Sequence, residues 1–493
     1  MRRRDFIRDT AVSAAALLLP GALRGEGLAG RAVPASRSDP VRILGRVATA
    51  GRGLAGVGVS DGLSVVRTDG EGRFELVADR AARWLHVCTP SGYEIPVSAT
   101  GTAAGYRSIE AGAGGEMEAA FELSPLREDP DRHAFLVLAD PQTENAFEMA
   151  RFHDETVPDV ARTVADLGVP TFGVGCGDIM YDDLSMFPEY ERAVLRMGVP
   201  FVQVVGNHDL DFEARTDEAS TATFKRFFGP GHYSFERGEV HYVVLDDVFW
   251  HGAGYLGYLS ARQLTWLAAD LAHVEAGRTV VVFAHIPAHS TLAVRSGAEG
   301  PSTGESMANR EALYRLLEPY RAHVLSGHIH ELEHVFEGGV HECVNGAVCG
   351  AWWSGDICYD GAPNGYGVYE VADSEVRWRY KATGLAADHQ IRLYRDGDQV
   401  IANVWGWDPE WRVVWYEGGE RRGAMERYTG LDPRSVAEHA GAARPPRREW
   451  VEPVPTDHLF RSSIVAEGPV TVEATDRFGR TYSAVLDGRS IGP

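Results

Sequence analysis

Short hydrophobic runs separated by polar residues fill the middle of the chain. Six of these runs have the length and composition of buried strands: Phe135–Ala139, Phe172–Gly175, Phe201–Val205, Tyr242–Leu245, Val280–Ala284 and Val324–Ser326. Between them, apolar residues recur with the period of an amphipathic helix, at Val157, Val160, Val164 and Leu167 and again at Leu264, Leu267, Leu271 and Val274. This alternation of strands and helices predicts a layered α/β core.

Period-two alternation dominates the segments on either side of this core. Val41–Val47 alternates, and a turn within Thr68–Phe74 separates two extended runs, which predicts an N-terminal β-sandwich domain over residues 41–123. Residues 124–132 are polar and contain two prolines, which is typical of a linker. Ile391–Tyr394 and Val400–Trp405 alternate around an Asp-Gly turn. A C-terminal all-β domain is therefore expected over 376–493, and the α/β core over 133–372.

The first 35 residues have the composition of an export signal. Arg3 and Arg4, followed by Asp5-Phe6-Ile7, resemble a twin-arginine signal, and the apolar segment Ala11–Leu23 comes next. This segment, at about 13 residues, is too short for a transmembrane helix. The sequence therefore predicts a twin-arginine signal peptide over 1–35 and a periplasmic or extracellular protein that is exported already folded. The alternative is a basic N-terminus that carries paired arginines by chance.

Acidic residues outnumber basic ones, and the formal net charge is −22, from 48 Lys and Arg against 70 Asp and Glu. A surface of this sign repels nucleic acids and anionic lipids, so we expect neither a nucleic-acid partner nor stable membrane insertion. A small phosphate ester remains a candidate substrate because bound divalent cations would reverse the field locally. The five cysteines form no Cys-x-x-Cys pair and are too few for a disulfide framework, so we expect them to be buried.

Polar side chains follow five of the predicted strands, at the point where each strand ends. They are Asp140, Asp178, the run Asn207-His208-Asp209, His285, and the pair His328 and His330. Open α/β sheets bind their ligands at this edge. Carboxylate and amide oxygens and imidazole nitrogens are ligands for Mn, Fe, Zn or Mg, and no thiolate is needed. The sequence therefore predicts a site for two divalent metal ions.

These motifs, in this order, resemble those of the calcineurin-like metallophosphoesterase superfamily. The matching segments are Asp140-Pro141-Gln142, Gly177-Asp178, Gly206–Asp209, His285 and Gly327–His330. The resemblance implies a β-sandwich core flanked by helices, in the multidomain exported branch that has β domains on both sides. It implies a first metal held by Asp140, Asp178 and His330, and a second held by Asp178, Asn207, His285 and His328. It also implies that His208 is the general acid, that Asp209 orients its ring, and that a metal-bound hydroxide attacks phosphorus.

One residue departs from the pattern of the family. The first motif of the superfamily usually reads Asp-x-His, and Gln142 stands in the histidine position. An amide oxygen is a harder and weaker donor than imidazole, which favours Mn, Fe or Mg over Zn at the first metal. The alternative is that the site has lost one metal. Tyr181, three residues after Asp178, is expected to pack rather than to bind a metal.

A glycine-rich and tryptophan-rich segment follows the last metal motif. It contains Trp352, Trp353, Asp356 and Asn364, and we expect these residues, together with His289, to face the substrate. The alternative is that the segment packs between the core and the C-terminal domain.

The function that these features predict is hydrolysis of phosphate mono- or diesters by an exported enzyme with two divalent metal ions, of which Mn and Fe are favoured. Monoesterase, diesterase and pyrophosphatase activities share such a metal cluster, so the sequence does not distinguish them. The alternative from another class is a non-catalytic surface or glycan-binding protein that retains a relic phosphoesterase core.

Overall fold

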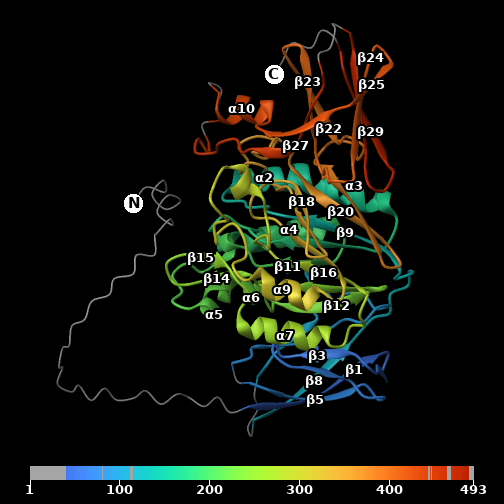
Figure 1. Cartoon of the computed structure of the whole chain (residues 1–493). Helices are drawn as coiled ribbons and strands as arrows, with labels where there is room; N and C mark the ends of the chain where they lie inside the picture. The colour runs from blue at the N-terminus through green and yellow to red at the C-terminus, as the bar shows by residue number, and fades with distance from the viewer. Residues whose placement is uncertain are drawn as a thin grey trace, which may run out of the picture. The chain divides into compact units, whose positions relative to one another are not determined.

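The computed structural model describes residues 40–79, 81–110, 115–441, 445, 447–463 and 468–487 (Figure 1). The predicted signal peptide, residues 1–35, lies outside the described residues. The chain from Asp39 onwards forms one compact unit. Three successive groups of sheets lie along this unit.

Two four-stranded sheets form an N-terminal β-sandwich. One consists of β1 (Val41–Thr49), β2 (Arg52–Gly53), β5 (Arg73–Ala78) and β8 (Glu116–Glu122), and the other of β3 (Gly58–Ser60), β4 (Val65–Arg67), β6 (Trp84–Val87) and β7 (Tyr106–Ser108). Apolar side chains of both sheets share one core, which includes Ile43, Val59 and Leu85. In β5, buried and exposed residues alternate, as expected for a strand with one face on the core.

Two larger sheets form the middle of the chain. The first has the order β11–β10–β9–β20–β21, with β9 (Arg132–Leu138), β10 (Thr171–Cys176), β11 (Phe201–Val204), β20 (Gly365–Ala372) and β21 (Glu375–Ala382). The second has the order β12–β13–β16–β17–β19–β18, with β12 (Tyr233–Arg237), β13 (Val240–Val244), β16 (Thr279–Phe283), β17 (Arg321–Ser326), β18 (Glu333–Glu337) and β19 (Val340–Val344). A separate hairpin pairs β14 (Val248–Trp250) with β15 (Tyr255–Gly257).

Parallel pairing explains why the predicted strands read as continuous apolar runs. Strands β9, β10 and β11 are parallel, and so are β13, β16, β17 and β19. Every residue of β10, β11, β13 and β16 is buried. Strands covered on both faces have no polar side to alternate with.

Helices cover the outer faces of both sheets, which gives four layers in the order helix, sheet, sheet, helix (Figure 1). The first sheet packs against α2 (Ala146–Arg151), the π-helical turn η1 (Phe152–Thr156), α3 (Val157–Leu167) and α4 (Phe187–Met197). The second packs against α7 (Ala261–Leu271) and α9 (Arg310–Leu317). The predicted α/β core is therefore confirmed. Shorter helices lie in the loops: η2 (Leu184–Met186), η3 (Asn207–Asp209), α5 (Asp217–Ser220), α6 (Ala222–Phe228) and α8 (Leu292–Arg295).

The last part of the chain folds into two further four-stranded sheets around one apolar core. They contain β22 (Ile391–Asp396), β23 (Gln399–Val404), β26 (Glu426–Gly430) and β27 (Thr456–Arg461), and β24 (Arg412–Glu417), β25 (Glu420–Ala424), β28 (Val470–Thr475) and β29 (Thr481–Leu486). One helix, α10 (Pro433–His439), interrupts this β domain. Asp432 caps it by accepting hydrogen bonds from two backbone N–H groups, and Pro433 supplies a favourable first residue.

The predicted boundary at residue 376 falls inside a core strand. β21 pairs antiparallel with β20 along eight residue pairs, and β20 pairs with β9. Alternation predicts a strand at this position but does not identify the sheet that the strand joins.

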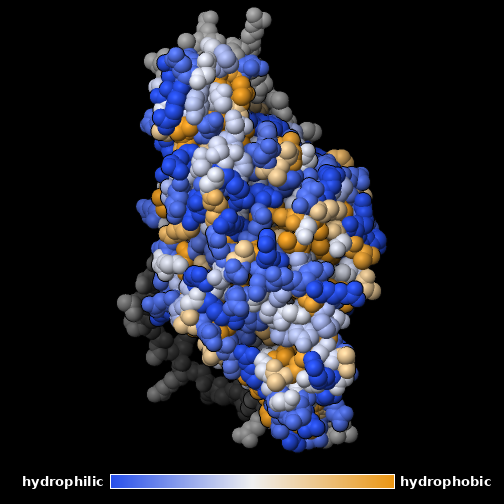
Figure 2. Space-filling model, turned by 90° about the vertical axis from the view of Figure 1, so that its right-hand side faces the viewer, coloured by the Kyte–Doolittle hydropathy of each residue, from blue (hydrophilic) through white to orange (hydrophobic). Residues whose placement is uncertain are grey.

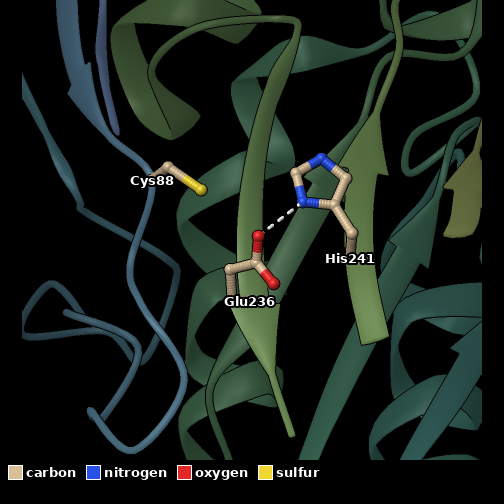
Figure 3. A group of neighbouring side chains, drawn as sticks. All are labelled: Cys88, Glu236 and His241. Atoms are coloured by element: carbon tan, nitrogen blue, oxygen red, sulfur yellow. Dashed lines mark hydrogen bonds and ion pairs between the residues drawn. The ribbon is translucent and has the colours of Figure 1, made fainter. Parts of the chain in front are cut away.

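A buried ion cluster lies where the N-terminal sandwich meets the second core sheet (Figure 3). His241 Nδ1 lies 2.8 Å from Glu236 Oε1, and Nε2 lies 2.8 Å from Asp270 Oδ2. Burial lowers the pKa of His241, but the carboxylates of Asp270 and Glu236 outweigh it and raise the pKa to about 9. Cys88 faces this pair, and burial raises the pKa of its thiol. Because both nitrogens of the imidazolium are occupied by carboxylates, the cluster is an internal ion pair of the core, and Cys88 of the N-terminal sandwich lies beside it.

All five cysteines are free, and four of them are buried. Figure 2 shows one face of the protein, on which hydrophilic residues surround smaller hydrophobic groups. Among the described residues, no helix combines the length and the hydropathy that a membrane crossing requires.

Candidate metal centre

The seven predicted metal ligands converge at one edge of the two core sheets. Asp140 follows β9, Asp178 follows β10, Asn207 follows β11, His285 follows β16, and His328 and His330 follow β17. The parallel orientation of these strands brings their carboxyl ends together. All seven side chains are buried except His328, which is partly exposed.

His285 is the centre of this cluster. Its Nε2 lies 3.2 Å from Asp178 Oδ1, 3.1 Å from Asn207 Oδ1 and 3.2 Å from His328 Nδ1. His330 Nε2 lies 3.8 Å from Asp140 Oδ1, and the carboxylate of Asp140 accepts a hydrogen bond from the backbone N–H of His328. One carboxylate, one amide oxygen and two imidazoles thus face a common point.

Backbone carbonyls orient the three imidazoles. His285 Nδ1 lies 3.0 Å from the carbonyl oxygen of Cys176, His328 Nε2 lies 2.7 Å from that of Gly304, and His330 Nδ1 lies 2.6 Å from that of Gly350. A carbonyl oxygen only accepts, so each of these ring nitrogens carries the hydrogen. The other nitrogen of each ring points into the cluster. This is the arrangement by which proteins orient histidine ligands of metals.

The charges of the cluster fit a divalent cation. In the metal-free protein, burial and then the neighbouring Asp178 raise the pKa of Asp140 to about 8, although His285 opposes them. Burial lowers the pKa of His285, but Asp178 and Asp140 raise it to about 10. Burial lowers the pKa of His328 to about 3 and that of His330 to about 4, so both are neutral. Asp140 and His285 thus hold protons in the metal-free protein that a divalent cation would displace, whereas the neutral imidazoles of His328 and His330 are already free to donate.

Left-handed backbone conformations concentrate at this site. Asp140 has φ of 50°, Asp178 of 45°, His328 of 73° and His330 of 49°. Among described residues other than glycine, all those with positive φ lie in or beside the cluster except Ala50 and Asp373; the remainder are Gln142, Asp182, Trp352, Trp353 and Arg448. Such conformations are costly and persist where the surrounding structure enforces them, typically at functional sites.

Gln142 lies in the cluster, but its amide nitrogen faces Asp178. Nε2 donates to Asp178 Oδ2 at 3.1 Å, while Oε1 lies 3.8 Å from Cys349 Sγ. A metal would require the oxygen on the side of Asp178, which a half-turn of the amide provides.

His208 is held by Asp182 and not by Asp209, contrary to the sequence-based prediction. His208 Nδ1 lies 2.5 Å from Asp182 Oδ1, and Nε2 lies 4.0 Å from Asp178 Oδ2. Asp209 is fully buried and accepts hydrogen bonds from the backbone N–H groups of Ile179, Met180 and Gly206. It therefore ties together the two loops that carry Asp178 and Asn207. Adjacency in sequence suggested Asp209, but its side chain turns into the loops.

Of the five predicted substrate residues, Trp352 contacts the cluster: its ring stacks on His330 at 4.0 Å. Trp353 is buried and donates from Nε1 to the carbonyl oxygen of Pro141, so it supports the loop of the first motif. Asp356 pairs with Arg434 of α10, and Asn364 is buried behind Gly350. His289 pairs with Arg310 and Glu337. Trp353, Asp356 and His289 thus have partners within the protein, and the role of these residues toward substrate stays a prediction.

Two side chains of the C-terminal domain, Arg448 and Trp450, lie against residues beside the cluster, and neither was predicted from the sequence. The guanidinium of Arg448 lies 4.6 Å from the ring centre of Tyr181, and the ring of Trp450 lies 4.5 Å from that of Trp352. Tyr181 in turn stacks on His208 at 4.5 Å, which confirms that it packs. Arg448 is far from Tyr181 in the sequence, and Trp450 is far from Trp352. No local sequence pattern predicts contacts between segments so far apart.

Comparison with known proteins gives matches along most of the chain. Residues 133–332 match the family model for calcineurin-like phosphoesterase, residues 41–126 match the model for its N-terminal region, and residues 342–482 match the model for its C-terminal region. The chain is also 34% identical over 128 residues to a bovine (Bos taurus) protein, serine/threonine-protein phosphatase CPPED1, and 32% identical over 130 residues to its human counterpart. Each match covers 24% of this chain and 40% of the relative, so the chain spans about two fifths of the length of these curated relatives.

A solved structure of the purple acid phosphatase PPD1 from yellow lupin (Lupinus luteus) seeds is 12% identical, with a TM-score of 0.35, over 66% of this chain and 67% of that one. A score of this size adds nothing to the family assignment. The assignment comes from the three family models, which follow one another along the chain in the order of its three parts. The chain belongs to the calcineurin-like phosphoesterase family, with the N-terminal and C-terminal regions that accompany the phosphoesterase core.

Proposed function

We propose that this protein is a two-metal hydrolase of phosphate mono- or diesters that is exported by the twin-arginine pathway. The observation that carries the proposal is the orientation of three imidazoles. His285, His328 and His330 each donate one N–H to a backbone carbonyl and turn the other nitrogen toward the same cluster. Together with the family, this geometry supports metal binding, because the nitrogens that do not bond a backbone carbonyl face the oxygen ligands Asp178, Asn207 and Asp140.

The donors divide into two overlapping sets. Asp140, Asp178 and His330 would hold one ion, joined by Gln142 after rotation of its amide. Asp178, Asn207, His285 and His328 would hold the other. Bound divalent ions supply Lewis acidity toward the phosphoryl oxygens and the attacking water. Because an amide oxygen is a harder donor than imidazole, the set that includes Gln142 favours Mn or Fe over Zn.

His208 is placed to handle the proton of the leaving group. Burial lowers its pKa, but Asp178 and Asp182 outweigh burial and raise it, which favours the protonated ring. Since Asp182 occupies Nδ1, the proton available for transfer is the one on Nε2. This nitrogen lies on the side of Asp178, where a bound phosphate ester would present its leaving oxygen.

Export rests on the sequence of residues 1–35, in which Arg3 and Arg4 precede a short apolar segment. Folding before export would allow the metals to be loaded in the cytoplasm. A fusion of these residues to a reporter should cross the membrane, and Arg3→Lys with Arg4→Lys should retain it inside.

The test of the enzymatic proposal combines metal analysis with turnover. The purified protein should contain divalent metal and hydrolyse members of a panel of phosphate mono- and diesters, and Asp178→Ala should abolish both. His334→Gln is a control variant, since His334 is a half-buried histidine, as His328 is, but lies on β18. Absence of both metal and turnover in the folded wild-type protein would instead favour a non-catalytic surface protein with a relic core.

A further inference from the structure

The C-terminal domain reaches the candidate metal centre through one loop. This loop lies between α10 and β27, and its Arg448 contacts the ring of Tyr181 at 4.6 Å. Tyr181 belongs to the loop after β10, the same loop that carries Asp178 and Asp182. A side chain from a separate β domain is thus in contact with the innermost loop of the core.

Arg448 is anchored on the core by two acidic residues of the α2 region. Its Nη2 lies 2.7 Å from Glu144 Oε2 and 3.3 Å from Glu148 Oε1. Glu148 is fully buried and also accepts a hydrogen bond from the backbone N–H of Glu144. Charge-assisted bonds to a buried carboxylate hold the guanidinium more firmly than an exposed ion pair would. Arg448 itself has φ of 61°, a conformation that is costly for a residue other than glycine.

Tyr181, which Arg448 contacts, also stacks on His208. The two rings stack at 4.5 Å with an interplanar angle of 18°, and Tyr181 is only 5% exposed. Asp182 fixes the direction of His208 within the plane of the ring through Nδ1. A stacked neighbour fixes the tilt of that plane, which a single hydrogen bond leaves free.

We propose that Arg448 is a positioning residue that holds Tyr181 flat against His208, so that the C-terminal domain sets the direction of His208 Nε2. The inference rests on the proposed function, in which His208 protonates the leaving oxygen. It gives the C-terminal domain a role in turnover in addition to any role in stability. Small errors in the placement of an acid reduce its contribution strongly, because proton transfer depends on both distance and direction.

The experiment compares two esters that differ in their need for an acid. The leaving group of a p-nitrophenyl phosphate ester is p-nitrophenolate, a stable anion that needs no proton. The leaving group of an alkyl phosphate ester is an alkoxide, which must be protonated as it leaves. Arg448→Ala should lower kcat for the alkyl ester by about 10- to 100-fold and for the p-nitrophenyl ester by less than about 3-fold, with KM for both unchanged. Arg448→Lys should restore part of the loss, since an ammonium also binds the face of an aromatic ring.

Arg447→Ala is the matched control. Arg447 pairs with the same Glu148 at 2.9 Å, but its guanidinium lies over Phe147 and not over Tyr181. It should leave both esters unaffected, and thermal unfolding and metal content should be measured for all variants. Equal losses on both esters, or the same selective loss in Arg447→Ala, would overturn the positioning role. Failure of the wild-type protein to hydrolyse either ester would refute the proposed function itself, and this inference with it.

Discussion

Asp182 Oδ1 lies 2.5 Å from His208 Nδ1, in a loop where Asp182 adopts φ of 70°. The short contact fixes which ring nitrogen is free. Asp182→Ala should therefore lower kcat by about 10- to 100-fold with little effect on metal content, because the acid remains but its direction and charge are no longer fixed. Steady-state kinetics on an alkyl phosphate ester will measure this. Asp183→Ala, which removes two hydrogen bonds from Ser185 at the start of η2, is the neighbouring control. Equal losses in both variants would contradict the special role of Asp182.

Replacement of Asp209 should lower the stability of the fold more than it lowers the rate of turnover. Its carboxylate accepts three backbone hydrogen bonds in a fully buried position. Asp209→Ala leaves these N–H groups without a partner, which should lower the free energy of unfolding by about 2–4 kcal/mol. Urea unfolding monitored by tryptophan fluorescence will measure the change. A variant of unchanged stability and reduced turnover would restore the orienting role that adjacency to His208 suggested.

Metal removal should inactivate the enzyme and destabilise the fold. Extraction with EDTA leaves Asp140 and Asp178 buried beside each other, so the thermal midpoint should fall together with activity. Added Mn should restore both more effectively than Zn, and Gln142→His should shift this preference toward Zn. Calorimetric thermal scans and activity after titration with each metal provide the measurement. Better recovery with Zn in the wild-type protein would contradict the argument from Gln142.

The free energy of unfolding should fall as the pH rises into the alkaline range, because His241 then loses its proton. Its pKa is about 9 in the folded protein against an ordinary value of 6.5, so the folded state binds the proton more tightly than the unfolded state. This contribution is fully present below pH 6.5 and is lost as the pH rises through about 9. The charged groups around the ring are Glu236, Asp270 and Arg278, the last paired with Glu236.

The measurement is the free energy of unfolding of the wild-type protein minus that of His241→Gln at a series of pH values. The difference should be greatest below pH 6.5 and disappear above pH 9. A difference that is independent of pH would show that the imidazole is neutral and only packs. Cys88→Ser serves as a control at the same junction because it leaves the ion pair intact.

The sequence predicted the layers and the cluster well for one physical reason. Buried parallel strands must be apolar along their length, and the residues that follow them are brought to one edge by the topology, whatever the details of the loops. Asp140, Asp178 and His285 could therefore be located without knowing any contact. The family resemblance then supplied the roles that strand periodicity does not.

What the sequence did not predict depends on the direction in which side chains point and on contacts between distant segments. Asp182 and Asp209 are both acidic neighbours of the site, and only loop geometry decides which one meets His208. Trp352 and Trp353 are adjacent, yet one lies on His330 and the other supports Pro141. Arg448 of the C-terminal domain contacts Tyr181 of the core, and the periodicity of apolar residues does not predict contacts between domains.

The β20–β21 hairpin limits how the chain can be divided. A fragment that ended at Ala372 would keep β20 but remove its partner, and a row of unpaired backbone N–H and C=O groups would become the edge of the first sheet. Exposed edges of this kind pair with other chains and lead to aggregation. In the intact protein β21 protects that edge with charged residues such as Arg377, and Arg480 of the C-terminal domain donates to the carbonyl oxygen of Trp378. The C-terminal domain therefore also occupies a backbone group of β21, the edge strand of this sheet.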